Sequence, residues 1–312
     1  MPNDHIPVDV RLPKGVRCAI ALTYDTDMAG GYAPDGICHG RTMPALQEYI
    51  MRLCGTAEQF GVRLQFFQIG NGLVLPDVVE HVRQVLQRGH AVDSHTYSHL
   101  PLITKEVAQL GEELALTNQL FEEKLGWKST VLRGPGGYQN GLDGLPENQR
   151  VILKNGFKWV SGRFNGNLLG RRGATSTEGP ALEPPYAYPT GLIEFPIQAA
   201  TDRTWFDTLR CVSPEAWTQW RKECGHKPIP KGWRAPWTDK DALDDWIRYN
   251  QAVADFAYER RLACCLCWHP YSHYVHDPDN RALPAFLAHC AAKTEKVWVC
   301  TMRDLVEMCV SQ

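Results

Sequence analysis

Residues 19–27 read Ala-Ile-Ala-Leu-Thr-Tyr-Asp-Thr-Asp, and the loop Met-Ala-Gly-Gly-Tyr follows directly. This apolar run is typical of a buried strand, because such strands are short, continuous apolar segments bounded by turn residues. Residues i and i+2 of a strand point to the same side, so Asp25 and Asp27 are expected to converge while Thr26 turns away. Two close carboxylates repel, and they usually hold a cation or share a proton. Two loop aspartates that cap the next helix are the simpler alternative.

Segments of alternating helix and strand character extend outward from this stretch. Apolar periodicity and turn residues predict helices over 43–60, 76–88, 104–125, 146–155, 241–261 and 282–292, and strands over 64–69, 90–95, 130–133, 157–161, 192–196, 262–268 and 297–300. Residues 165–189 are irregular, residues 205–237 resist assignment, and Thr301–Asp304 forms a predicted capping box. The alternation indicates a parallel sheet, and the absence of a break in composition predicts one domain, residues 1–312, forming a closed or nearly closed α/β barrel.

Composition and charge exclude several classes of protein. The chain has 312 residues, 44% hydrophobic and 22% charged, with a formal net charge of -2, which disfavours nucleic acid or an anionic membrane as the main partner. No apolar stretch approaches the ~18 residues of a membrane-spanning helix, and the N-terminus does not have the pattern of a signal peptide. The 11 cysteines fall largely in apolar runs, so we expect reduced, buried thiols in a cytoplasmic protein.

A second informative stretch, His95-Thr-Tyr-Ser-His99, follows the predicted strand 90–95. If a helical turn begins at His95, the two imidazoles lie on one face, an arrangement that binds metals. A turn capped by histidine is the alternative. Both imidazoles and Asp27 are expected at the carboxyl ends of barrel strands, where α/β barrels place their chemistry. One carboxylate and two imidazoles leave coordination positions for water and substrate, as a catalytic metal site requires.

Two further strand ends carry candidate catalytic residues. Arg133 opens the sequence Arg-Gly-Pro-Gly-Gly-Tyr, and it can pair with Asp25 and orient it; a structural ion pair under a tight turn is the alternative. His269 leaves the predicted strand 262–268 in the sequence Trp-His-Pro, where it can act as a general acid. A core histidine bonded to the backbone is the alternative there. His273 and His276 are weaker candidates for the same role.

In this order the motifs resemble those of the polysaccharide deacetylase (NodB-homology) family, from residue 18 to about residue 270. Thr23–Asp27 is similar to its first motif, His95–His99 to its second, Arg133–Pro135 to its third and Trp268–Pro270 to its last. The resemblance implies a distorted (β/α)7 barrel and hydrolysis of amide C–N bonds, most often the removal of acetyl from amino sugars. It also implies a divalent metal, most often Zn2+, held by one Asp and two His, which here are Asp27, His95 and His99.

The chain departs from the commonest first motif, Thr-Phe-Asp-Asp-Gly, in having Asp-Thr-Asp. This form resembles the branch with peptidoglycan deacetylase-like intracellular proteins, cyclic imidases and metal-free allantoinases. The resemblance then implies that Asp25 is the general base, oriented by Arg133, and that His269 protonates the departing nitrogen. The complete triad Asp27, His95 and His99 disfavours the metal-free version.

Residues that line the pocket can be suggested but not fixed by sequence. The segments 30–41 and 165–189 are long enough to cover the barrel mouth, and aromatic and imidazole side chains could line an enclosed pocket or simply pack at the surface: Tyr32, His39, Tyr138, Trp233 and Trp237. Glu194 and Asp202 resemble positions that shape the site in the intracellular branch.

The sequence therefore predicts a metal-dependent hydrolase of a small cyclic imide or ureide. The first alternative is an N-deacetylase of an amino sugar, peptidoglycan fragment or polysaccharide. More remote alternatives are a non-haem iron oxygenase, whose facial triad also has two histidines and one carboxylate, and an inactive binding module. By analogy with the intracellular branch, we expect a homo-oligomer whose partner is a small-molecule substrate rather than nucleic acid or membrane.

Overall fold

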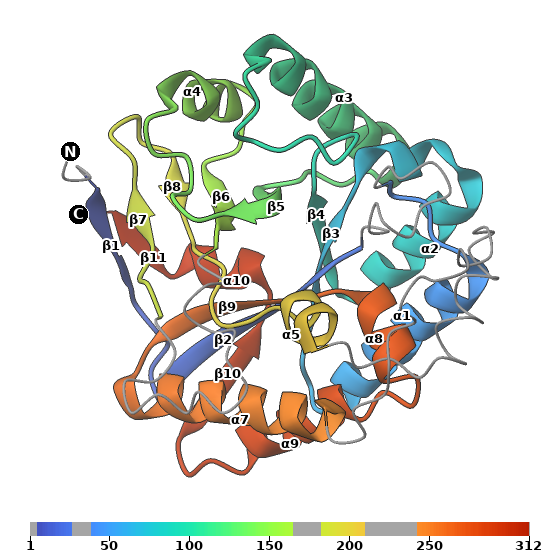
Figure 1. The fold of residues 1–312 in the computed structure, drawn as a ribbon, viewed down its shortest axis with the longest axis vertical. Coiled ribbons are helices and arrows are strands. Elements are labelled where there is room, and N and C mark those ends of the chain that lie inside the picture. The colour runs from blue at the N-terminus through green and yellow to red at the C-terminus, as the bar shows by residue number, and fades with distance from the viewer. Residues whose placement is uncertain (1–4, 27–38, 165–181, 210–241, 312) are drawn as a thin grey trace.

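The computed structural model describes residues 5–26, 39–164, 182–209 and 242–311, and Figure 1 shows their arrangement. The centre is a curled parallel sheet in which neighbouring strands run in the order β9-β2-β3-β4-β5-β6-β8. Their bounds are β2 Val16–Asp25, β3 Gln65–Gln68, β4 Ala91–Ser94, β5 Val131–Tyr138, β6 Trp159–Arg163, β8 Ile193–Glu194 and β9 Ala263–Trp268. A parallel bridge between Gln198 and Leu266 joins the segment after β8 to β9. These seven strands form the distorted (β/α)7 barrel that the motifs implied.

The long strand β2 organises the barrel. One edge pairs with β9 over residues Ala19–Tyr24. The other edge is shared, because β10 (Lys296–Cys300) pairs with its first half and β3 with its last residues, Thr23 to Asp25. Its residues Cys18 to Tyr24 are almost completely buried, which accounts for the continuous apolar run in the sequence.

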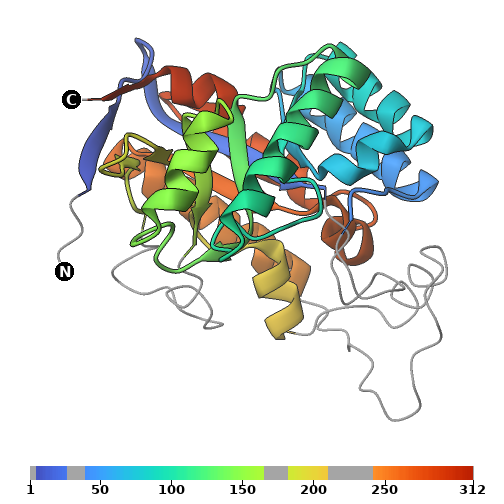
Figure 2. The same cartoon turned by 90° about the horizontal axis from the view of Figure 1, so that it is seen from above.

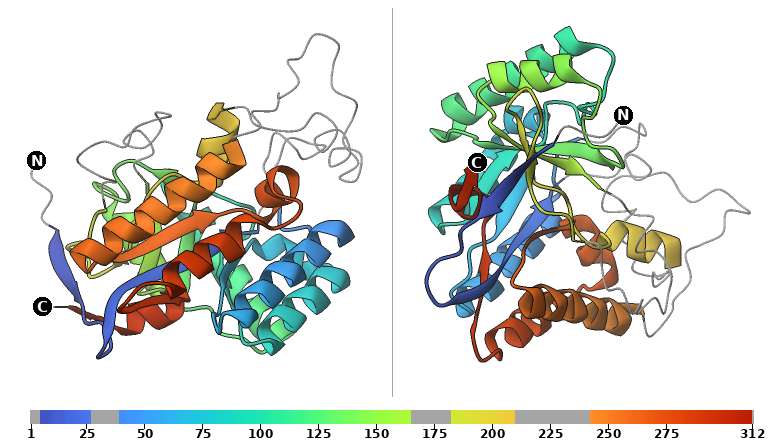
Figure 3. Two further views of the ribbon diagram at one scale, coloured as in Figure 1. Left: turned by 90° about the horizontal axis from the view of Figure 1, so that it is seen from below. Right: turned by 90° about the vertical axis from the view of Figure 1, so that its left-hand side faces the viewer.

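Helices cover the outside of the sheet, as Figures 2 and 3 show. Their bounds are α1 Pro44–Gln59, α2 Pro76–Gln87, α3 Val107–Leu125, α4 Pro146–Lys154, α5 Asp202–Leu209, α7 Ala242–Arg260, α8 Pro270–His276, α9 Ala282–Ala291 and α10 Met302–Glu307. In α1 the buried residues Leu46, Ile50, Leu53 and Ala57 repeat at helical spacing and form the face that packs inward. In the described part of the chain, no helix is both long and apolar enough to cross a membrane.

An antiparallel extension at one edge of the sheet was not predicted. Strand β1 (Ile6–Val10) pairs with β7 (Tyr186–Ala187) and with β11 (Cys309–Ser311), so that the two ends of the described chain lie side by side (Figure 1). These strands have two to five residues, and for that reason they lack the long continuous apolar run that marks β2 and β9.

The predicted elements otherwise agree with the structure to within a few residues at their ends. The predicted capping box is confirmed, because the Thr301 hydroxyl accepts a hydrogen bond from the Asp304 backbone N–H at 3.0 Å. The strand predicted over 130–133 is longer, since β5 continues through the glycine-rich segment to Tyr138 with a register shift beside β6. Of the segment 205–237, which was left unassigned, residues 205–209 belong to α5, and residues 210–237 lie outside the described residues.

Candidate active site

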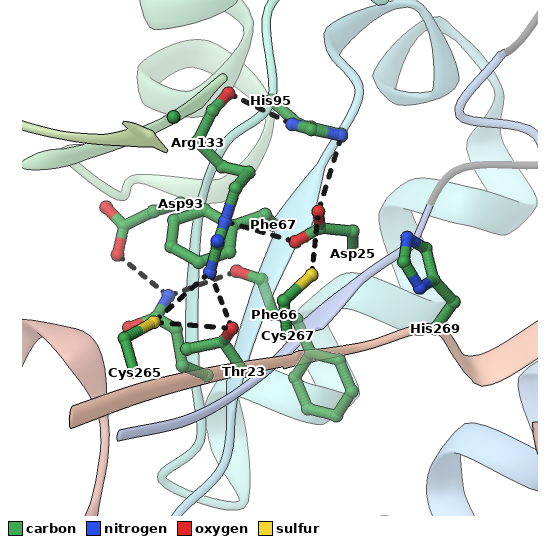
Figure 4. Close-up of polar contacts among 12 residues, drawn as sticks. Thr23, Asp25, Phe66, Phe67, Asp93, His95, Arg133, Cys265, Cys267 and His269 are labelled. Atoms are coloured by element: carbon green, nitrogen blue, oxygen red, sulfur yellow. Dashed lines mark hydrogen bonds and ion pairs between the residues drawn. The ribbon is translucent and has the colours of Figure 1, made fainter. Parts of the chain in front are cut away.

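The carboxylate of Asp25 lies at the centre of the predicted site, at the end of β2. It is buried, and its Oδ1 lies 3.3 Å from Arg133 Nε, while its Oδ2 lies 3.8 Å from His95 Nε2. The Cys267 thiol donates a hydrogen bond to the same Oδ2, with an S···O distance of 3.3 Å (Figure 4). The strand ends of β2, β4, β5 and β9 therefore bring these four side chains together, as the barrel topology predicts.

The Arg133 side chain is fully buried on β5 and supports Asp25 from inside the barrel. Its Nη2 donates to the Thr23 hydroxyl at 2.6 Å, and the guanidinium lies 4.6 Å from the centre of the Phe67 ring. Burial alone would lower the pKa of this guanidinium, but the charge of Asp25 together with the interactions with Cys265 and Cys267 offsets that effect, and the net shift is upward. The expected pairing of Arg133 with Asp25 is therefore seen in the structure, and the geometry fixes where the carboxylate points.

The two histidines of the second motif come together without forming a helical turn. Residues 95–100 are a loop, with positive φ at Thr96 (60°) and His99 (64°), so the predicted helical turn is wrong. The loop is held instead by backbone bonds to residues 70 and 71 and by Glu113, which accepts a hydrogen bond from the Ser98 N–H at 3.0 Å. The rings of His95 and His99 nevertheless lie with their centroids 4.9 Å apart.

The geometry of His95 fits a metal ligand. Its Nδ1 lies 3.0 Å from the Arg133 carbonyl oxygen, a distance at which an Nδ1–H donates to that acceptor. This bond selects the tautomer whose Nε2 carries a lone pair, and Nε2 faces Asp25. With His99 beside it, two imidazoles are available to a divalent cation. The third predicted ligand, Asp27, lies outside the described residues, as do three of the suggested pocket residues, Tyr32, Trp233 and Trp237.

A buried carboxylate positions His269, the predicted acid. Strand β9 ends at Trp268 and Pro270 begins α8, which leaves His269 at the helix N-cap. Asp202 accepts hydrogen bonds from His269 at both oxygens, from its backbone N–H at 2.8 Å and from Nδ1 at 2.7 Å. Burial would raise the pKa of Asp202, but the charge and hydrogen bonds of His269, together with His273, leave it below its usual value. Asp202, predicted to bind substrate, therefore lies behind His269 and contacts it directly.

The other residues predicted to bind substrate make contacts within the protein. The Tyr138 hydroxyl accepts a hydrogen bond from the Leu102 N–H at 2.7 Å, and His39 Nδ1 accepts one from the Arg41 N–H at 3.2 Å. Glu194 is completely buried in β8 and accepts hydrogen bonds from the backbone N–H groups of Gly162 (2.7 Å) and Arg163 (2.9 Å).

Two residues near Asp25 were not among the predicted site residues. Thr23 anchors Arg133, and Cys267 contacts Asp25. Burial raises the pKa of the Cys267 thiol well above its usual value, so the neutral S–H group is the donor to Asp25. The signal was present in the period-two pattern of strands: Thr23 and Asp25 share one side of β2, and Cys265 and Cys267 share one side of β9.

Comparison with known proteins supports the motif assignment. Residues 15–142 match the sequence model of the family described as polysaccharide deacetylase. A protein of Mycobacterium smegmatis assigned to the polysaccharide deacetylases has a similar fold, with 19% identity, a TM-score of 0.66, and coverage of 97% of this chain and 94% of that chain. A protein of Pseudomonas aeruginosa PAO1 with the same assignment has 17% identity and a TM-score of 0.60, with coverage of 95% of this chain and 92% of that chain. The allantoinase PuuE has 14% identity and a TM-score of 0.58, with coverage of 95% of this chain and 91% of that chain. No curated protein matches the chain.

Proposed function

We propose that the chain is a metal-dependent hydrolase of non-peptide C–N bonds. Its motifs, the match of residues 15–142 to the polysaccharide deacetylase family model and its fold all support this class. The observation that carries this proposal is the convergence of Asp25, Arg133, His95 and His269 from four separate parts of the barrel. Hydrolysis of an amide requires a base, an acid and a group that activates the carbonyl. The site offers a carboxylate fixed by a guanidinium, an imidazole with a defined tautomer, and a second imidazole that is hydrogen-bonded to Asp202.

The divalent metal, most often Zn2+ in this type of site, would be held by His95, His99 and Asp27. When bound, it polarises the substrate carbonyl and stabilises the negative charge that develops on its oxygen. On the protein side, the hydrogen bond from His95 Nδ1 to the Arg133 carbonyl keeps the ring oriented and its Nε2 directed to the site. One backbone group of Arg133 thus orients a metal ligand, while its side chain orients Asp25.

Asp25 acts as the general base in this proposal. It accepts a proton from the attacking water as the water oxygen bonds to the carbonyl carbon. The Arg133 contact at 3.3 Å and the Cys267 thiol at 3.3 Å engage the two carboxylate oxygens from different sides, so the carboxylate cannot rotate freely. Fixed orientation matters because proton transfer depends on alignment with the water.

His269 acts as the general acid. As the C–N bond breaks, its imidazolium gives a proton to the departing nitrogen, and Asp202 stabilises the charged ring through the contact at Nδ1. A ring nitrogen of His269, an Asp25 oxygen and the Cys267 sulfur all lie within 4.8 Å of one another. Acid and base are therefore close enough to act on the two sides of one small scissile group.

We favour a small cyclic imide or ureide as the substrate. The Asp-Thr-Asp form of the first motif supports this class, and so does the structural likeness to an allantoinase over 95% of this chain. The second candidate is N-deacetylation of an amino sugar or peptidoglycan fragment, which the description of the matched family favours. An α/β barrel argues against a non-haem iron oxygenase, for which an all-β barrel is usual.

The test is the loss of ultraviolet absorbance from a panel of cyclic imides and ureides. We expect turnover with the zinc-loaded protein, none after chelation, and recovery when zinc is returned. Asp25→Asn should abolish turnover, while Asp9→Asn, which makes the same change at an exposed position of β1, should not. Turnover of no imide or ureide by zinc-loaded protein, with acetate released from an acetylated amino sugar, would replace the first substrate class by the second. If neither activity is detected, the chain is a binding module.

A further inference from the structure

The Cys267 thiol lies inside the candidate active site and, in the proposed reaction, only helps to orient Asp25. It is 2% exposed, and its sulfur lies 3.3 Å from Asp25 Oδ2. Strand alternation explains its direction: Cys265 and Cys267 lie on one side of β9, and Cys265 reaches Arg133 Nη2 at 3.5 Å. Cys264, the residue before Cys265, faces the other way and packs in the main hydrophobic core.

Three different ligand types meet at this point. One oxygen of Asp25, the Cys267 sulfur and a ring nitrogen of His269 lie within 4.8 Å of one another, and all three residues are buried (Figure 4). With metal–ligand distances of about 2.0–2.3 Å, ligand atoms around a tetrahedral cation lie roughly 3.3–3.8 Å apart. The observed 3.3 Å between the Asp25 oxygen and the Cys267 sulfur already meets this spacing.

A second observation points to a cation. Asp25 Oδ1 is buried without a hydrogen-bond donor among the described residues, although it lies 3.3 Å from the charged Arg133. A carboxylate oxygen accommodates several donors or a metal, so this atom retains capacity for an additional positive partner. The set also differs from the predicted ligands Asp27, His95 and His99 in having sulfur, which favours thiophilic cations over Mg2+ or Ca2+.

We propose that Asp25, Cys267 and His269 form a second cation site, which takes a thiophilic divalent cation such as Zn2+ or Cd2+. On binding, the Cys267 S–H bond breaks, its proton passes to solvent, and the sulfur bonds to the cation without a change in oxidation state. A cation bound there occupies the base and the acid together, and therefore blocks hydrolysis. This last consequence rests on the proposed function; the binding itself does not.

Cadmium titration of the chelated, metal-free full chain tests the site. Thiolate ligation of Cd2+ produces a charge-transfer band in the ultraviolet, which reports sulfur coordination without any substrate. We expect the wild type to show a saturable band that is missing from Cys267→Ser. Thiols elsewhere contribute equally to both proteins and cancel in the difference spectrum. Cys265→Ser, two residues away on the same side of β9, is the matched control and should keep the band.

His269→Asn tests whether the thiol acts with its neighbours. Loss of a residue that hydrogen-bonds to a metal ligand typically weakens metal binding about 10–100-fold. Loss of a direct ligand should therefore raise the Kd for cadmium, measured from the Cys267-dependent band, at least about tenfold. Circular dichroism of each variant shows that it is folded. Superposable cadmium spectra for wild type and Cys267→Ser would overturn the site, as would an unchanged Kd in His269→Asn. Because neither readout needs turnover, failure of this site and failure of the proposed hydrolysis are distinguished.

Discussion

Replacement of Glu194 by glutamine should change the pH dependence of folding. The Glu194 carboxyl is completely buried, and burial raises its pKa to about 7, despite hydrogen bonds from two backbone N–H groups and from the Tyr188 hydroxyl. In the unfolded chain the same carboxyl ionises near 4.5. Between these two values the folded protein binds more protons than the unfolded chain, so its stability falls as pH rises.

The size of the effect follows from the two pKa values. One pKa unit corresponds to about 1.4 kcal/mol, so a pKa near 7 in place of 4.5 corresponds to about 3 kcal/mol. This stabilisation of the protonated carboxyl is fully present below pH 4.5 and is lost as pH rises through about 7. Glutamine has no such titration. The free energy of unfolding of the wild type should therefore gain about 3 kcal/mol relative to Glu194→Gln when the pH is lowered across this range.

Urea unfolding followed by tryptophan fluorescence at a series of pH values measures the difference. Tyr188→Phe supplies a companion variant, because it removes the 3.1 Å hydrogen bond to the ionised carboxyl and should raise the Glu194 pKa further. The wild type and Glu194→Gln would show a constant difference in unfolding free energy over this range if the carboxyl were well solvated or paired. That result would refute the reasoning.

Three further predictions concern the supports of the site. Asp202→Asn should lower kcat by about 10²–10⁴-fold while the protein stays folded. The asparagine amide has one oxygen, so it cannot accept the hydrogen bonds from the His269 backbone N–H and from Nδ1 at two separate oxygens. Arg133→Met should lower the unfolding free energy by ~3–5 kcal/mol in thermal unfolding, since it leaves Asp25 buried and unpaired. Gly72→Ala should destabilise the protein by about 1–3 kcal/mol in urea unfolding, because the added methyl group would overlap the Gly40 carbonyl.

The sequence was sufficient for the barrel because its strands carry a strong local signal. β2 and β9 are buried on both sides, so nearly every residue is apolar, and the polar residue that ends each run marks the carboxyl end of the strand. The edge strands β1, β7 and β11 were missed for the converse reason. They have two to five residues each, and they pair antiparallel with segments that are distant in sequence. Such short strands have no distinctive pattern.

The candidate site was predicted only in part, because contacts between distant segments depend on register. Arg133 was correctly expected to pair with Asp25, since opposite charges at strand ends on one barrel face attract. The pairing of Asp202 with His269 could not be read from spacing, as it requires the turn after β8 to bring residue 202 under β9. Cys267 was interpreted only as a small buried hydrophobe, because its position in an apolar run does not indicate that β9 pairs with β2 and brings Asp25 within reach.

Three buried carboxyls of this chain show that an acidic residue at a strand end is not always part of an active site. Asp25 has the guanidinium of Arg133 at 3.3 Å, and Asp202 has the imidazoles of His269 at 2.7 Å and His273 at 3.6 Å. Glu194, in the described part of the chain, has only backbone amides and a tyrosine hydroxyl as donors. The first two are carboxylates whose charge is matched by a cation or by an imidazole that can become one, which is the arrangement that proton transfer uses. Glu194 lacks such a partner, so burial favours its neutral form, and it holds the end of β6 through the backbone N–H groups of Gly162 and Arg163. Partner charge, rather than position at a strand end, separates the carboxylates suited to catalysis from the structural one.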